Sequence, residues 1–81
     1  MKNETLIAAR KQSGKTQKQV AQKSAIATIA YQSYERGTRT PIVTTAIKIA
    51  NALGVKDFQE FCELWGTTPY GYYSRSQLKS N

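Results

Sequence analysis

Hydrophobic residues recur at three- and four-residue spacings in five short stretches of the chain, and polar residues fill the positions between them. The first stretch spans residues 4–12, and two more lie between Gln17 and Gly37. The fourth runs from Pro41 to Gly54, and the fifth from Asp57 to Gly66. No stretch shows a clear strand alternation and no internal repeat is visible, so the pattern predicts an all-α fold of five helices.

The segment of residues 17–37 predicts two short helices joined by a tight turn, which is a helix-turn-helix. Thr16 is a hydroxyl residue that can cap the first of these helices. The small, helix-poor residues 24–26 then interrupt the helical run. We expect either Thr28 or Ser24 to cap the second helix, which ends at a glycine able to adopt a positive φ.

The spacing also predicts which side chains point into the core. In the helix-turn-helix these are Val20, Ala21, Ile26, Tyr31 and Tyr34. In the fourth helix they are Val43, Ile47, Ala50 and Leu53, with Ile49 beside them. We expect Thr40 to cap the fourth helix with Pro41 in its first turn, and Asp57 to cap the fifth helix with Glu60 at capping-box spacing.

A length of 81 residues suits one domain with a small core. We expect this domain to span residues 1–66. Residues 67–81 are rich in Gly, Pro, Ser, Thr and Tyr and form a predicted flexible C-terminal tail. The tail is either disordered, an arm that crosses to a second subunit, or an arm that lies on nucleic acid.

Charge is segregated along the chain. The sequence has 12 Lys and Arg against 5 Asp and Glu, for a net charge of +7. Three of the five acidic residues, Asp57, Glu60 and Glu63, lie together near the end of the chain, so the rest of the chain is strongly basic. One face is therefore expected to be cationic, which suits nucleic acid but also describes an ordinary solvated surface. With no histidine and a single cysteine, Cys62, the chain lacks the residues for a zinc site, an intrachain disulfide or a histidine-based catalytic dyad. We expect no enzyme activity, no metal and no cofactor, and a core position for Cys62.

No apolar run has the length of a signal peptide or a membrane span, so we expect a cytoplasmic protein without membrane contact.

The chain resembles the phage repressor and Cro family of helix-turn-helix regulators, called the XRE family. The resemblance covers about residues 4 to 65, and the matching residues are Arg10, Thr16-Gln17, Glu35-Arg36-Gly37, Pro41 and Ala50-Asn51-Ala52-Leu53-Gly54-Val55. Two positions depart from the family pattern. Ala25 stands where a turn glycine is common, and Tyr31 stands where Ile or Val is common. A positive φ at Ala25 costs about 1 kcal/mol, and a buried Tyr31 needs a partner for its hydroxyl.

The resemblance implies a compact lambda-repressor-like domain whose third helix enters the major groove of double-stranded DNA. Four outward residues would contact bases, with adenine and thymine favoured: Thr28, Ile29, Gln32 and Ser33. The residues that would contact phosphates are Gln17, Lys15, Lys18, Arg36, Thr38, Arg39 and Thr40. The alternative is that these side chains are ordinary solvated helix positions. Arg10 and Glu35 would form a structural ion pair between the first and third helices.

The predicted function is therefore a sequence-specific transcriptional regulator, from a bacterium or a phage, that binds a pseudo-palindromic operator as a homodimer. The large apolar residues near the C-terminus either form a dimer seam or complete the core: Phe58, Phe61, Leu64 and Trp65, with Tyr70, Tyr72 and Tyr73 as a possible arm. The alternative function is an antitoxin-type protein-interaction module that also binds DNA, whose fifth helix and tail would neutralise an unknown protein partner.

Overall fold

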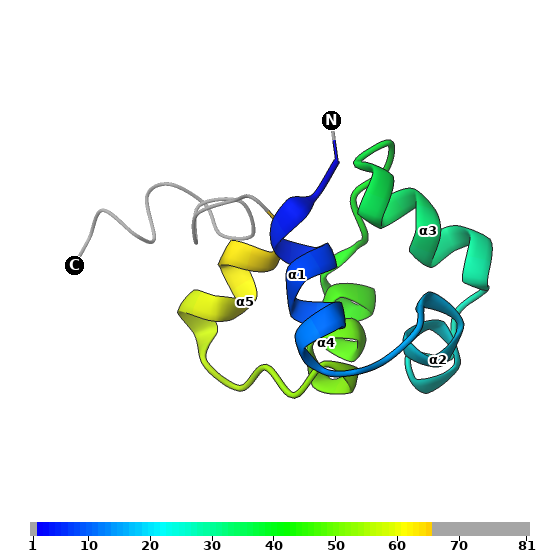
Figure 1. The fold of residues 1–81 in the computed structure, drawn as a ribbon. Coiled ribbons are helices and arrows are strands. Elements are labelled where there is room, and N and C mark those ends of the chain that lie inside the picture. The colour runs from blue at the N-terminus through cyan, green and yellow to red at the C-terminus, as the bar shows by residue number, and fades with distance from the viewer. Residues whose placement is uncertain (1, 66–81) are drawn as a thin grey trace.

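The computed structural model describes residues 2–65, except the Phe58 side chain. It contains five helices: α1 (Glu4–Gln12), α2 (Gln17–Lys23), α3 (Thr28–Arg36), α4 (Val43–Ala52) and α5 (Phe58–Leu64). The central helices α1 and α4 have α2 and α3 on one side and α5 on the other (Figure 1). No strand occurs in residues 2–65, so the prediction of an all-α, five-helix domain is confirmed. The predicted tail lies outside the described residues.

Three helices start at a side-chain cap. Asn3 caps α1 through a bond from the Leu6 N–H, and Asp57 caps α5 through a bond from the Gln59 N–H. Thr16 forms a full capping box with Gln19, in which each side chain accepts a bond from the other residue's N–H. The caps predicted at Thr16 and Asp57 are therefore confirmed, because each side chain satisfies an otherwise free N–H of the first turn.

The predicted caps of α3 and α4 are wrong. Ala27 precedes α3 and makes no side-chain cap bond, so neither Ser24 nor Thr28 acts as the cap. Helix α4 begins at Val43, two residues later than predicted, because Ile42 still has an extended backbone. Pro41 is buried ahead of the helix instead of forming its first turn.

Helices α1 to α5 enclose one hydrophobic core. Its buried members are Leu6, Val20, Ala21, Tyr31, Tyr34, Ile49, Ala50 and Leu64. Four of the five inward positions predicted for the helix-turn-helix are among them, and Ile26 packs against the core while partly exposed. Cys62 is buried too, as predicted.

The predicted inward face of α4 is partly wrong. Val43 and Ile47 are 41% and 45% exposed, whereas Ala46 and Ile49 are fully buried. Both sets follow helical spacing, so the apolar pattern alone does not fix which face turns inward. The packing of α4 against its neighbours α2 and α5 buries the face that carries Ala46, Ile49 and Ala50, and it leaves Val43 and Ile47 outside.

The turn between α2 and α3 contains the one non-glycine residue with a positive φ in residues 2–65. This residue is Ala25, with a φ of 58°. The conformation costs an L-residue about 1 to 2 kcal/mol, since its Cβ approaches the following carbonyl. The turn geometry predicted from the sequence is thus present at that cost. Gly37 ends α3 with a φ of 78°, as expected.

Asn3 joins three parts of the fold. Its side-chain oxygen caps α1, its backbone N–H donates to the Glu35 carbonyl at 2.8 Å, and its side-chain amide donates to the Leu64 carbonyl. The ends of α3 and α5 are therefore both attached to the start of α1.

Candidate nucleic-acid interface

A buried ion pair connects α1 to α3. The Arg10 Nε donates to Glu35 Oε2 at 2.6 Å, and a second guanidinium nitrogen donates to the Lys15 carbonyl at 3.0 Å. Glu35 is only 4% exposed. The predicted Arg10–Glu35 pair is confirmed, and it also holds the loop that leads into α2.

The surroundings of Glu35 keep its carboxylate ionised. Burial alone would raise the pKa of Glu35, but interactions with Arg10, Tyr31 and Gln17 outweigh it and lower the pKa below its usual value. The hydrogen bond to Glu35 raises the pKa of Arg10. Both members of the pair therefore carry their charge across the ordinary pH range.

Tyr31 interacts with both members of this ion pair. Burial, followed by hydrogen bonding with Glu35 and then by the Glu35 charge, raises the pKa of the Tyr31 hydroxyl, so the phenol stays neutral. Its oxygen is close enough to Glu35 for the two groups to interact electrostatically, yet it makes no hydrogen bond of normal geometry within residues 2–65. Glu35 therefore takes the place of the partner that a buried tyrosine was expected to need, although without normal hydrogen-bond geometry.

Gln17 extends the ion pair toward the surface of α3. Its Nε2 donates to Glu35 Oε1 at 2.9 Å, and its Oε1 accepts a hydrogen bond from Gln32 Nε2 at 3.2 Å. Arg10, Glu35, Gln17 and Gln32 thus form one continuous hydrogen-bonded series, which we call the polar chain. The link between Gln17 and Gln32 is not predicted by the sequence, because residues 15 apart on two helices share no periodic signal.

The four predicted base-contacting residues of α3 differ in exposure. Ile29 is 70% exposed, and Thr28 and Gln32 are half-buried. Ser33 is only 6% exposed and its hydroxyl donates to the Ala30 carbonyl, so the prediction that Ser33 points outward is wrong. The chain after α3 folds back here, and both the N–H and the hydroxyl of Thr38 bond to the Ser33 carbonyl.

The predicted phosphate-contacting residues are mostly at the surface. Lys18, Arg36, Thr38, Arg39 and Thr40 are exposed, and Lys15 and Gln17 are half-buried. They belong to the loop before α2, to α2, to the end of α3 and to the loop before α4. They therefore lie on the elements that flank the exposed part of α3.

The C-terminal helix mainly completes the core. Leu64 is 2% exposed, so of the two alternatives left open for this residue, a place in the core fits the folded chain. Phe61 and Trp65 are partly buried and pack against the core. The Phe58 side chain and the tyrosines at 70, 72 and 73 lie outside the described residues.

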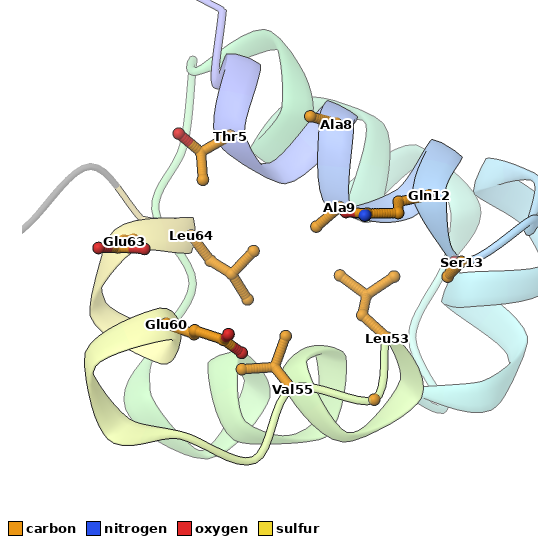
Figure 2. Close-up of a pocket in the computed structure, with 11 residues that line it drawn as sticks. Thr5, Ala8, Ala9, Gln12, Ser13, Leu53, Val55, Glu60, Glu63 and Leu64 are labelled. Atoms are coloured by element: carbon orange, nitrogen blue, oxygen red, sulfur yellow. The ribbon is translucent and has the colours of Figure 1, made fainter.

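A groove separates α1 from α5 on the other side of the molecule (Figure 2). It encloses about 390 Å³; Ala9, Leu53, Val55 and Leu64 line its apolar part, and Glu60 and Glu63 add carboxylates. The groove is thus acidic, whereas the α2–α3 face is basic.

Within residues 2–65 no three His, Cys, Asp or Glu side chains are grouped as metal ligands, and no helix is both long and apolar enough to cross a membrane.

Comparison with known proteins agrees with this geometry. Residues 6–61 match the protein family described as helix-turn-helix. Over 64 residues the chain is 38% identical to the cryptic phage CTXphi transcriptional repressor RstR of Vibrio cholerae serotype O1. The alignment covers 79% of this chain, which spans 56% of the length of that relative. No solved structure matches the chain significantly.

Proposed function

The chain belongs to the helix-turn-helix family, and we propose that it is a transcriptional regulator that binds double-stranded DNA through α3. The family match covers both helices of the motif and their supporting helices. A relative named as a phage transcriptional repressor supports regulation by DNA binding. Such a protein acts in the cytoplasm of a bacterium or of a phage-infected cell.

The observation that carries the proposal is the rigid mounting of α3 beside an exposed recognition surface. The polar chain fixes α3 to α1 and α2, while Ile29 at 70% exposure and the half-buried Gln32 remain accessible. An α-helix fits the major groove, where an apolar side chain contacts a thymine methyl and an amide pairs with adenine. We propose base contacts by Thr28, Ile29 and Gln32. Ser33 is not among them, because it is buried and cannot reach a base edge.

The exposed basic residues would position this helix on the DNA backbone. We propose phosphate contacts by the side chains that flank α3: Lys15, Gln17, Lys18, Arg36, Thr38, Arg39 and Thr40. Cationic side chains near phosphates release counterions and strengthen binding without regard to sequence. The net charge of +7 supports this role.

We further propose that two copies bind a pseudo-palindromic operator. One α3 offers few base-contacting side chains, so a pair of domains on half-sites about one helical turn apart gains affinity and specificity. The resemblance of the chain to the phage repressor and Cro family supports this arrangement. Leu64 is buried in its own chain, so it is not among the residues proposed to contact the second copy.

The proposal is tested by comparing Gln32→Ala with Arg39→Ala in duplex-binding measurements at several salt concentrations. The operator is first obtained by selecting random duplexes with the purified protein. We expect Gln32→Ala to change preference at one or two base pairs, and Arg39→Ala to weaken all duplexes and reduce the salt slope by about 1. Lys56→Ala, a basic surface control in the loop before α5, should do neither. Unchanged DNA affinity and preference in both test variants would contradict the proposal.

A further inference from the structure

We propose that the segment of residues 66–81 docks in the groove between α1 and α5 of its own chain, with tyrosine rings on the apolar floor and cations beside Glu60 and Glu63. The inference goes beyond the proposed function and does not depend on DNA binding. It assigns an occupant to the acidic side of the molecule, to which the proposed function gives no role.

The groove brings three kinds of surface together. Its floor is apolar, since the side chains of Leu53, Val55 and Leu64 point toward one another inside it (Figure 2). The Thr5 hydroxyl lies on the α1 edge, and the Glu60 carboxylate comes from α5. A volume of about 390 Å³ is within the range of sites that hold organic groups. A suitable occupant therefore combines apolar surface, hydrogen-bonding groups and positive charge.

The carboxylates of α5 are not neutralised within residues 2–65. Glu60 and Glu63 are exposed, and the one ion pair of the described residues joins Arg10 to Glu35 instead. The α2–α3 face on the other side of the molecule is basic. A cationic segment is therefore repelled by that face and attracted to the groove.

The composition of residues 66–81 complements the groove. The segment contains two cations and no acidic residue, which gives it a charge of +2, and it contains three tyrosines. These residues are Tyr70, Tyr72, Tyr73, Arg75 and Lys79. A tyrosine ring covers apolar surface while its hydroxyl bonds to a polar group at the edge. The segment thus supplies the three properties that the groove requires.

The chain enters this segment beside the groove, because Leu64 lines the groove and ends α5. Helix α1 has nine residues and is therefore about 14 Å long. Residues 66–70 span up to about 17 Å, so Tyr70 can reach any point along α1. Residues 66–75 span up to about 33 Å, which is enough to cross the groove and return to the carboxylates of α5. Attachment to the same chain gives a local concentration on the order of millimolar, so weak contacts suffice for docking.

The experiment measures how fast trypsin cleaves the full chain after Arg75. The reference is a synthetic peptide of residues 66–81, which has the same local sequence but no groove to bind. Mass spectrometry follows the products at low salt. We expect cleavage to be slower in the protein than in the peptide by about fivefold or more. This protection should not depend on protein concentration, because the groove belongs to the same chain.

Two glutamates in the first turns of their helices provide a matched pair of variants. Glu60→Gln removes a carboxylate of the groove, and Glu4→Gln removes one that does not line the groove. We expect Glu60→Gln to reduce the protection by about two- to fivefold and Glu4→Gln to leave it unchanged. Circular dichroism melting confirms that each variant is folded.

A tail variant tests the apolar part of the contact. Replacing Tyr70, Tyr72 and Tyr73 with serine leaves both cations in place, and the variant is compared with a peptide that carries the same serines. We expect most of the protection to be lost.

Equal cleavage rates in the wild-type protein and its peptide would overturn the inference. Full protection in Glu60→Gln would do the same, as would equal losses in Glu60→Gln and Glu4→Gln, since the latter result reflects charge in general. Full protection in the serine variant would show that the tyrosines do not bind the groove. Protection that falls on dilution would place the segment on a second copy and overturn its assignment to its own groove.

Discussion

The helix-turn-helix and the C-terminal helix are both attached to the same core, but they are built differently. The buried polar residues of the described chain all lie within residues 17–36: Ser24, Ser33 and Glu35. The buried residues of α5 are Cys62 and Leu64, while Glu60 and Glu63 stay exposed. Both regions bury apolar side chains in the shared core, but the first region adds a buried series of directional side-chain bonds, whereas α5 is positioned mainly by the removal of apolar surface from water.

This difference indicates what each region requires. Apolar packing stabilises a helix but tolerates small rotations and alternative side chains. A hydrogen-bonded series such as the polar chain holds donors and acceptors in one arrangement, at the cost of burying charge. A surface that must match the edges of bases needs the second property, whereas a helix that closes a core needs only the first.

Removing Glu35 should break this comparison most strongly. Glu35→Ala leaves Arg10, whose side chain is only 14% exposed, without its partner. Breaking such a buried pair costs about 3 to 5 kcal/mol, a large share of the stability of a small domain. Urea denaturation followed by circular dichroism measures the change in the free energy of unfolding.

The matched control is Glu63→Ala, which removes an exposed carboxylate from α5. Its free energy of unfolding should stay within about 0.5 kcal/mol of the wild type. Similar losses in the two variants would mean that the polar chain is no more important for stability than a solvated charge.

Acidification should weaken the helix-turn-helix by protonating the same carboxyl group. The pKa of Glu35 is lower in the folded protein than its ordinary value of 4.5, so folding favours the charged form. The resulting stabilisation is fully present above that ordinary pKa and is lost as the pH falls through the lower folded pKa. The loss should be smaller than in Glu35→Ala, because a protonated carboxyl still fills its position.

Urea midpoints measured at a series of pH values test this expectation. The wild type should lose stability in acid more steeply than Glu35→Gln, which has no carboxyl at this position to protonate. Parallel curves would show that Glu35 does not contribute to the acid dependence.

The smallest effect is expected at the turn before α3. Ala25→Gly relieves the positive φ of 58°, and although glycine has a larger unfolded-state entropy, the net stabilisation should be about 0.5 to 1 kcal/mol. The melting temperature should therefore rise by several degrees. Ala8→Gly, in the exposed interior of α1, should instead lower it. A lower melting temperature for Ala25→Gly would mean that the turn is not strained.

Much of the scaffold could be predicted because its signals are local. Thr16 and Asp57 stand at cap positions, Gly37 ends α3, and helical spacing identifies Val20 and Tyr31 as core residues. The Arg10–Glu35 pair was predicted by family resemblance rather than by any local rule.

The errors have tertiary causes. Ile47 follows the same spacing as the buried residues of α4, and only packing against the neighbouring helices decides which face is covered. Ser33 has the spacing of an outward residue, but the chain at Thr38 folds back over it. Gln17 and Gln32 meet only once the two helices cross, so their partnership depends on the angle of the turn at Ala25.

The three hydrogen bonds of Asn3 make the helix-turn-helix and the C-terminal helix depend on each other, although the two regions are built differently. One residue ties the last turn of α5 and the end of α3 to the beginning of α1. Fraying of α5 therefore removes a bond from the residue that holds the carbonyl of Glu35. A local opening at the far end of the domain is thereby coupled to the recognition helix, so the five helices should open as one cooperative unit rather than as a stable motif with a loose appendage.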